Sequence, residues 1–119
     1  MTSIGIDIVE IERIELAIKQ WERRFLHRIY TEAELQLCQG RISTLAVRFA
    51  AKEAVMKVLG TGARGVGWRE IEILADAHGK PFVKLHGQAQ VKAKELNLGE
   101  ICVSLSDTEQ LAIAAAIGT

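Results

Sequence analysis

Alternation of apolar and polar residues predicts strands at both ends of the chain. Near the start, three isoleucines recur at every second position: Ile4, Ile6 and Ile8. Gly5 and Asp7 lie between them, and this period of two is typical of a β-strand with one buried face. Near the end, residues 101–106 (ICVSLS) and 111–117 (LAIAAAI) have the same character. The four residues DTEQ between them predict a hairpin.

A period close to 3.6 residues predicts helices in the first half of the chain. Apolar residues return on one side across residues 11–30, which predicts one amphipathic helix. Thr31 followed by Glu34 is a capping-box pattern, so we expect a short helix from there to Gly40. A longer helix is expected at residues 44–59.

The second half predicts the remaining elements of an α+β fold. Residues 60–67 (GTGARGVG) indicate a flexible loop, because four of the eight are glycines. Strands are expected at residues 68–75 (WREIEILA) and 81–87 (PFVKLHG), and a helix at 88–96. We therefore expect a single domain over residues 1–119, with an antiparallel-rich sheet and packed helices.

Composition and charge narrow the possible functions. The chain has 119 residues, of which 49% are hydrophobic and 25% charged, as in globular proteins. Its formal net charge is zero, so we expect no nucleic-acid or membrane partner. No apolar run approaches the ~20 residues of a membrane helix, and the first residues do not resemble a signal peptide. Cys38 and Cys102 form no CxxC pair, so we expect reduced, buried thiols in a cytoplasmic protein.

The expected helix at residues 44–59 carries four charges on an otherwise apolar surface. At 100° per residue, six small or β-branched residues share one arc, which we expect to face the core: Val47, Ala50, Ala51, Ala54, Val55 and Val58. Glu53 and Lys57 lie on a separate edge, and Arg48 and Lys52 form a second charged edge. From this helix alone, the ordinary interpretation is a Glu–Lys pair worth ~0.2–0.5 kcal/mol beside two solvated cations.

Asp7 changes this interpretation. Aspartate is disfavoured within strands, and Gly5 leaves space on the same face. Asp7 is either an exposed or helix-capping carboxylate, or it converges with Glu53. Two carboxylates, completed by water and phosphate oxygens, are a usual way for proteins to hold Mg²⁺. Arginine and lysine beside such a pair suit a polyphosphate substrate.

Two motifs together resemble a known family. GIDIVEI near the start and RFAAKEAVMKVLG in the middle are similar to the signature motifs of the 4′-phosphopantetheinyl transferases. Their order and the length of the chain resemble the holo-[acyl-carrier-protein] synthase group. The resemblance implies transfer of the 4′-phosphopantetheine arm of coenzyme A to a serine of an apo-acyl carrier protein, with release of adenosine 3′,5′-bisphosphate. It also implies Mg²⁺, a place in fatty acid biosynthesis and lipid metabolism, and a homotrimer with active sites between subunits.

The resemblance also assigns roles to residues of this chain. Asp7 and Glu53 match the metal ligands, and Glu53, directly or through a metal-bound water, is the choice of general base. Lys57 would hold a phosphate or assist proton transfer. Four positions are implied to bind coenzyme A: Arg48 at a phosphate, and Gly60, Lys80 and Pro81 along the nucleotide cleft.

A basic segment suggests where the carrier protein binds. Residues 13–28 hold five arginines and lysines against two glutamates. Acyl carrier proteins are acidic, so a basic helix could attract one while apolar neighbours contact its recognition helix. The family resemblance implies four docking residues: Arg13, Arg23, Arg24 and Arg28. A solvated helix surface remains the alternative for any one of them.

Some interpretations stay open. Where many relatives carry a histidine, this chain has Asp107, which is either an additional metal ligand or a residue of the hairpin turn; we favour the turn. A Mg²⁺-dependent nucleotide phosphohydrolase would use the same carboxylates and cations without needing a carrier protein. A non-catalytic module that binds coenzyme A or acyl carrier protein would keep its binding without Asp7 and Glu53 and would show no turnover.

Overall fold

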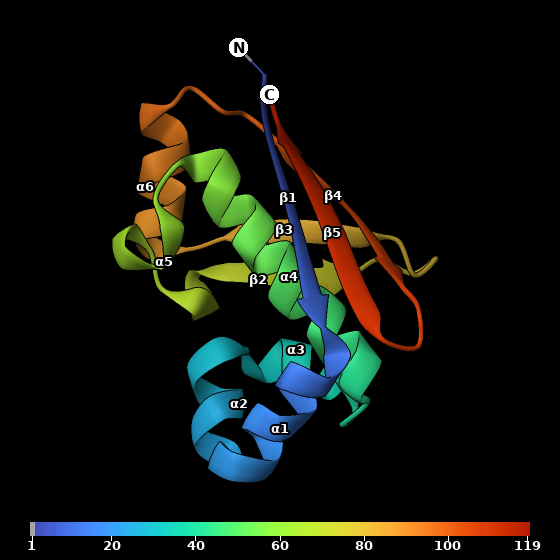
Figure 1. Ribbon diagram of the computed structural model, residues 1–119. Helices are drawn as coiled ribbons and strands as arrows, with labels where there is room; N and C mark the ends of the chain where they lie inside the picture. The colour runs from blue at the N-terminus through green and yellow to red at the C-terminus, as the bar shows by residue number, and fades with distance from the viewer. Residues whose placement is uncertain (1) are drawn as a thin grey trace.

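Two antiparallel sheets and one long helix form the framework of the molecule (Figure 1), in a computed structural model that describes residues 2–119. The larger sheet has the order β1-β5-β4, with β1 at Ser3–Glu10, β4 at Ile101–Asp107 and β5 at Leu111–Gly118. The smaller sheet pairs β2 (Ile71–Ala75) with β3 (Pro81–Leu85). Every strand pair is antiparallel. The predicted α+β class and the β4–β5 hairpin are confirmed.

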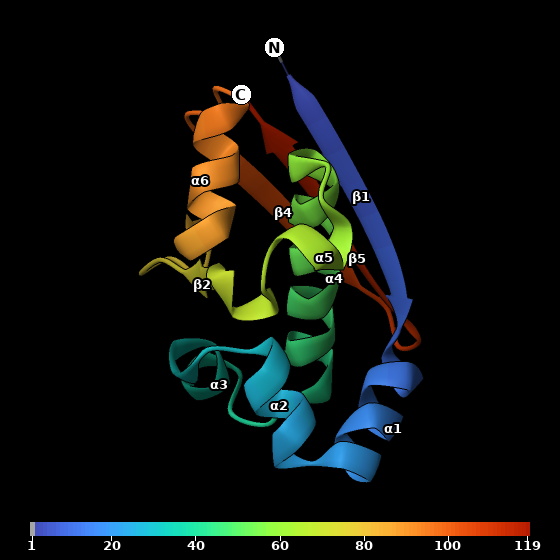
Figure 2. The same ribbon diagram turned by 90° about the vertical axis from the view of Figure 1, so that its left-hand side faces the viewer.

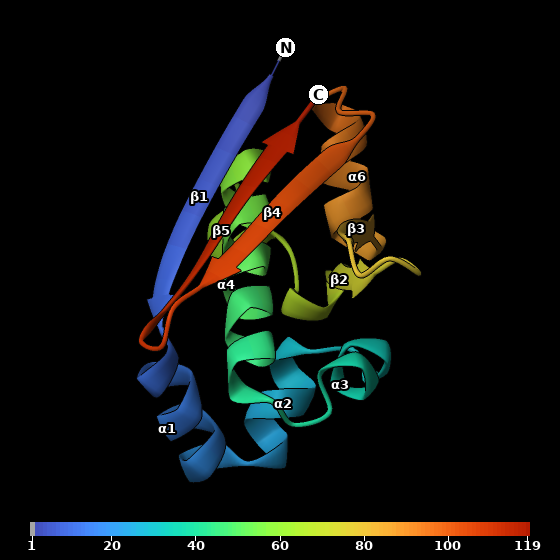
Figure 3. The same ribbon diagram turned by 90° about the vertical axis from the view of Figure 1, so that its right-hand side faces the viewer.

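The helices lie on only one side of the larger sheet. They are α1 (Ile11–Trp21), α2 (Arg23–Ile29), α3 (Glu32–Cys38), α4 (Ile42–Leu59), α5 (Gly62–Gly65) and α6 (Gly87–Glu95), with a 3₁₀ turn η1 at Trp68–Glu70. Figure 3 shows α4 behind the three strands, and Figure 2 shows α4 between that sheet and α6. Helices α1, α2 and α3 gather at the end where β1 finishes (Figure 1). Within the described residues, no helix is long and apolar enough to cross a membrane.

The core lies between α4 and the larger sheet, as the helical arc predicts. All six residues of that arc are buried. They face three fully buried alanines of β5: Ala112, Ala114 and Ala116. Small side chains on both surfaces let the helix and sheet approach closely. The closest approach is at Gly5, where an added Cβ would lie 2.1 Å from the carbonyl oxygen of Ala54.

The prediction that the isoleucines of β1 form its buried face is wrong. Ile4, Ile6 and Ile8 are 71%, 63% and 57% exposed, whereas Gly5 and Val9 are buried. The period of two is right, but the inner face meets the backbone of α4 and has room only for small groups near Gly5. The isoleucines therefore lie on the outer face of the sheet. Their partners on β5, Ile117 and Ile113 opposite Ile4 and Ile8, extend this apolar surface.

Four local predictions also need correction. Residues 11–30 form two helices, because Glu22 adopts φ 48° and ψ −122° and breaks the chain direction between α1 and α2. This break lets Phe25 and Ile29 pack onto the core. The predicted loop at residues 60–67 contains α5, and residues 68–70 form η1 before the strand begins. Both cysteines are free, but only Cys38 is buried; Cys102 is exposed on the edge strand β4.

Candidate functional site

Asp7 projects from the inner face of β1 toward the second half of α4. The Nζ atom of Lys57 donates to the carbonyl oxygen of Ile6 at 2.7 Å and lies 3.4 Å from Oδ1 of Asp7. The Asp7 side chain is 12% exposed, whereas the Lys57 side chain is 55% exposed. Because Gly5 has no side chain, β1 comes close enough to α4 for this contact. The structure therefore joins the strand motif to the helix motif.

Glu53 lies one helical turn before Lys57 and shares a small pocket with it. The pocket has a volume of about 150 Å³ and is also lined by Met56, Gly62 and Trp68. The negative charge of Asp7 acts on Glu53. The two predicted carboxylates therefore lie in one electrostatic site, and Trp68 borders it.

The electrostatics of the site disfavour two free carboxylate anions. Burial raises the pKa of Asp7, although the ammonium of Lys57 opposes the shift. Burial and then repulsion from Asp7 raise the pKa of Glu53, against smaller effects of Lys57 and Arg13. A cation bound between the two carboxylates would remove this repulsion. Asp7 and Glu53 would therefore both be ionised more easily with a cation between them.

Two carboxylates fit Mg²⁺ better than they fit a metal ion whose ligands all come from the protein. Among residues 2–119, no group of three or more His, Cys, Asp or Glu side chains is placed to hold a metal. Mg²⁺ usually takes one or two carboxylates and keeps water and substrate phosphates as its other ligands. Asp7 and Glu53 can supply the protein's share of such a site.

Arg48 lies in a different cavity, on the opposite side of α4. Nine residues separate Arg48 from Lys57, which at 100° per residue places them on opposite faces of the helix. The cavity has a volume of about 350 Å³ and is lined by Lys80 and Pro81, together with Gly79, Val103, Ser104 and Leu105. The structure thus brings three predicted coenzyme A residues together, but away from Glu53. Gly60 lines neither cavity and ends α4 at φ 71°.

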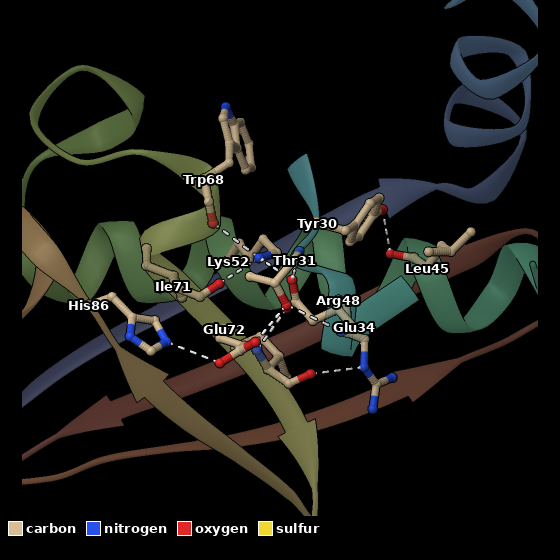
Figure 4. Close-up of polar contacts among 11 residues, drawn as sticks. Tyr30, Thr31, Glu34, Leu45, Arg48, Lys52, Trp68, Ile71, Glu72 and His86 are labelled. Atoms are coloured by element: carbon tan, nitrogen blue, oxygen red, sulfur yellow. Dashed lines mark hydrogen bonds and ion pairs between the residues drawn. The ribbon is translucent and has the colours of Figure 1, made fainter. Parts of the chain in front are cut away.

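The prediction that Lys52 lies with Arg48 on a solvated, charged edge of the helix is wrong. Its side chain is fully buried, and Nζ donates to Oε1 of Glu34 at 2.8 Å, to the carbonyl of Trp68 at 3.0 Å and to the carbonyl of Ile71 (Figure 4). Burial lowers the pKa of Lys52, although Glu34 opposes this. With three acceptors around its ammonium, Lys52 has a structural role. Arg48 is also buried, and its Nε donates to the carbonyl of Ile73 at 3.1 Å.

Glu34 has two functions, and its sequence pattern revealed only the first. It completes the predicted capping box of α3, because its Oε1 accepts from the backbone N–H of Thr31 at 2.8 Å and Thr31 accepts in return from the N–H of Glu34. The second function is in the core, where its Oε2 accepts from the N–H of Ile73 at 2.7 Å. Neither periodicity nor spacing indicates that Glu34 pairs with Lys52, since the two are 18 residues apart in sequence.

Glu72 continues this polar network toward β3. It accepts a hydrogen bond from Oγ1 of Thr31 at 2.6 Å and lies 3.0 Å from Nε2 of His86 (Figure 4). Burial would raise the pKa of Glu72, but these two partners outweigh it and hold the pKa below its usual range. The network joins α3, α4, β2 and the residue that follows β3 into one unit.

The four predicted docking arginines are all exposed on α1 and α2. Arg24 and Arg28 flank a cavity of about 600 Å³, whose remaining lining is apolar: Ala17, Trp21 and Phe25. Trp21 is 49% exposed. Arg13 acts electrostatically on both Asp7 and Glu53, so α1 begins beside the carboxylate site. Arg24 and Arg28 therefore form a basic rim around an apolar hollow, and Arg13 extends the positive charge of these helices toward the carboxylate site.

Asp107 ends β4 and does not line the pocket of Glu53. It borders a separate cavity of about 910 Å³ with several glutamates: Glu10, Glu12, Glu15 and Glu109. The adjacent Thr108 forms the turn, because its Oγ1 accepts from the backbone N–H groups of Gln110 and Leu111. This position is consistent with Asp107 as a residue of the hairpin.

Comparison with known proteins places these features in a family context. Residues 3–116 match the family model described as the 4′-phosphopantetheinyl transferase superfamily. A holo-[acyl-carrier-protein] synthase of Herpetosiphon aurantiacus is 45% identical over 125 residues, covering 99% of this chain and 98% of the relative. One from Roseiflexus castenholzii is 51% identical over 110 residues, covering 87% of this chain and 81% of the relative.

Solved structures show the same architecture. The holo-[acyl-carrier-protein] synthase of Helicobacter pylori in complex with coenzyme A aligns with a TM-score of 0.89 at 32% identity, covering 98% of this chain and 99% of that one. The enzyme from Neisseria meningitidis aligns with a TM-score of 0.90 at 37% identity, covering 98% and 97% of the two chains. The family resemblance drawn from two short motifs is confirmed.

Proposed function

The chain belongs to the 4′-phosphopantetheinyl transferase superfamily, and we propose that it transfers the 4′-phosphopantetheine moiety of coenzyme A to a serine of an apo-acyl carrier protein. The products are holo-acyl carrier protein and adenosine 3′,5′-bisphosphate. One observation carries this proposal: Asp7 and Glu53, distant in sequence, share a site with the cation of Lys57. We place this activity in the cytoplasm, in fatty acid biosynthesis, with residues 1–119 as one catalytic domain.

The chemistry requires positioning and charge neutralisation more than a covalent intermediate. The carrier serine attacks the phosphorus nearer the pantetheine while the nucleoside phosphate leaves in line. Asp7 and Glu53 would hold Mg²⁺, which supplies positive charge to the diphosphate oxygens when bound. Lys57 is exposed enough to turn from the Ile6 carbonyl to a phosphate oxygen. Glu53, whose pKa is raised by burial and by Asp7, suits a base that accepts the serine proton.

The nucleotide half of coenzyme A is assigned to the cavity of Arg48, Lys80 and Pro81. Nε of Arg48 donates to the carbonyl of Ile73 and Nη1 to the carbonyl of Thr44 at 3.4 Å, which leaves Nη2 for a phosphate. Lys80 adds a second positive charge, and Pro81 an apolar surface for the base. Gly60 has weaker support, because it lines neither this cavity nor the pocket of Glu53.

Two features support a homotrimer with active sites between subunits. The outer face of the larger sheet exposes isoleucines on β1, and such an apolar surface suits contact with another protein. The second feature is that Arg48 and Lys57 project from opposite sides of α4. A single coenzyme A could meet both half-sites if a neighbouring subunit supplied one of them.

The isoleucine face gives a direct test of assembly. We expect Ile6→Lys to reduce the particle mass in solution to that of one chain, because the change would bury an ammonium in an apolar contact. Sedimentation velocity measures the mass, and transferase activity should fall with it. The control is Val91→Lys, since Val91 is an exposed apolar residue on α6 outside this face. An unchanged mass for Ile6→Lys would contradict assembly through this face.

The basic rim predicts salt-dependent binding of the carrier. We expect the double variant Arg24→Ala with Arg28→Ala to raise the KM for apo-carrier roughly tenfold at low salt, with little change in the KM for coenzyme A. The difference should shrink at high salt, where the charges are screened. Lys84→Ala with Lys94→Ala, two exposed cations on β3 and α6, is the matched control. Equal carrier KM values for both double variants would argue against docking at α1–α2. Alanine variants of Arg13 and Arg23, the other two predicted docking residues, extend the test.

The raised pKa values predict how Mg²⁺ affects stability. Without a cation, the folded state favours the protonated forms of Asp7 and Glu53, whose ordinary pKa values are 3.8 and 4.5. Their contribution to folding stability is therefore complete below those ordinary values, and it is lost as pH rises through the raised pKa values of the folded state. Mg²⁺ requires the anions, so it should stabilise at neutral pH, by about 2.7 kcal/mol at one hundred times its dissociation constant, and not in acid. Thermal unfolding with and without Mg²⁺ measures this. Asp7→Asn should remove the effect at every pH; its persistence would exclude this metal site.

The function itself is tested with apo-carrier, coenzyme A and Mg²⁺. Mass spectrometry should show the carrier gaining one phosphopantetheine, together with stoichiometric adenosine 3′,5′-bisphosphate. Release of nucleotide without any carrier would indicate the phosphohydrolase instead. Binding of either substrate without turnover, unchanged in Asp7→Ala, would indicate a non-catalytic module.

A further inference from the structure

Three aromatic rings form a continuous row across the face of α4. The ring of Phe49 stacks on Trp68 with a centroid distance of 4.8 Å and an interplanar angle of 19°. On its other side, Phe49 stacks on Phe25 at 6.3 Å and 27°. The three rings come from α2, α4 and η1, which are far apart in sequence. All three are partly buried, so the row lies at the surface of the core.

The two ends of this row open into two different cavities. Phe25 lines the hollow with Trp21, Arg24 and Arg28 to which we assign the carrier protein. Trp68 lines the pocket that contains Glu53 and Lys57. Phe49 lines neither cavity and connects the ring in one to the ring in the other.

A second connection holds the backbone of Trp68 to α4 and α3. Its carbonyl oxygen accepts from Nζ of Lys52, and Lys52 pairs with Glu34 (Figure 4). Glu34 lies in the first turn of α3, directly after α2 and Tyr30. The side chain of Trp68 is therefore linked through Phe49 to the docking cavity, and its backbone is held to α4 and, through Lys52, to α3, the helix that follows α2.

We infer that Phe49 is a positioning residue that fixes the docking cavity relative to the pocket of Glu53. This inference rests on the proposed function. A carrier protein bound at α1–α2 must present its serine to a phosphorus beside Glu53, and a flat ring between Phe25 and Trp68 sets the separation. Misplacement by about 1 Å can cost roughly 10²-fold in rate, even when the altered residue touches neither reactant. Phe49 thus acts on the reaction through its two neighbours.

The test compares variants with and without a flat ring. In the full-length protein, Phe49→Leu should lower kcat at saturating apo-carrier and coenzyme A by roughly 10–100-fold. Its KM for coenzyme A should stay within about twofold, because Arg48 and Lys80 are untouched. Phe49→Tyr keeps the ring and should restore kcat to near the parent value. Phe49→Met, which fills similar volume without a ring, replaces the leucine variant if that fails to fold.

Trp68 provides a signal that loss of stability alone would not change. The chain has two tryptophans; Trp21→Phe keeps an aromatic ring in the docking cavity and leaves Trp68 as the sole tryptophan. In that background, a tryptophan-free apo-carrier should change the emission of Trp68, and Phe49→Leu should abolish the change while Phe49→Tyr keeps it.

The outcomes separate this inference from the proposed function. If the parent protein forms no holo-carrier, both are overturned. If the parent is active and Phe49→Leu matches Phe49→Tyr in kcat and in Trp68 emission, only the positioning role is overturned. A large drop in kcat for the leucine or methionine variant, with rescue by tyrosine, supports it.

Discussion

Glu53→Gln is expected to slow transfer of phosphopantetheine to the carrier by roughly 10³-fold, because the substitution removes both a metal ligand and the proposed base. The variant should remain folded. Burial and Asp7 raise the pKa of Glu53, which means that the folded state disfavours the carboxylate anion. A neutral amide of the same shape should therefore leave thermal stability at pH 7 unchanged or higher.

The measurement is the initial rate of holo-carrier formation by mass spectrometry, with thermal unfolding recorded on the same samples. Glu95→Gln is the matched control, since Glu95 is exposed at the end of α6. It should retain the parent rate. A Glu53→Gln variant with a rate within about threefold of the parent would exclude Glu53 from both proposed roles.

Gly5→Ala is expected to damage stability and catalysis together. The added Cβ would lie 2.1 Å from the carbonyl oxygen of Ala54 and 3.1 Å from Cβ of Lys57. Backbone in a packed helix cannot yield easily, so β1 must move away from α4. We expect a loss of roughly 1–3 kcal/mol in the free energy of unfolding, as for other overpacked sites. Because Asp7 is on the same strand, its contact with Lys57 should lengthen. The transfer rate of Gly5→Ala should therefore fall well below that of the control Glu95→Gln.

Gly99→Ala separates this effect from a general effect of alanine. Gly99 has no heavy atom within 4 Å of an added Cβ, so the substitution should be tolerated. Chemical denaturation gives the stability of both variants, and the rate of holo-carrier formation gives the activity. If Gly5→Ala behaves like Gly99→Ala in both measurements, close approach of β1 and α4 does not build the site.

Local patterns predicted those elements whose neighbours are close in sequence. The capping box at Thr31 and Glu34 and the buried arc of α4 were predicted correctly, because each depends on residues three or four positions apart. The break at Glu22 was missed, since the residue carries no turn signal and the contact that follows the break, Phe25 on Phe49, joins residues 24 positions apart.

Long-range partners explain the other errors. Alternation in β1 shows which residues share a face, but it cannot show whether that face meets the protein's own core or another surface. Lys52 and Arg48 looked like exposed cations because their acceptors, on Glu34, Trp68 and Ile73, lie far away in the sequence. An aspartate within a strand left convergence with Glu53 as one alternative, and only the family motifs selected it, since no pattern of spacing relates Asp7 to Glu53.

The opposite orientations of Arg48 and Lys57 on α4 have a genetic consequence. In the proposed trimer, each reaction centre would combine one face of this helix with the other face of a neighbour's helix. Chains defective at Asp7 could then be complemented by chains defective at Arg48, since a mixed assembly would contain some centres built only from intact halves.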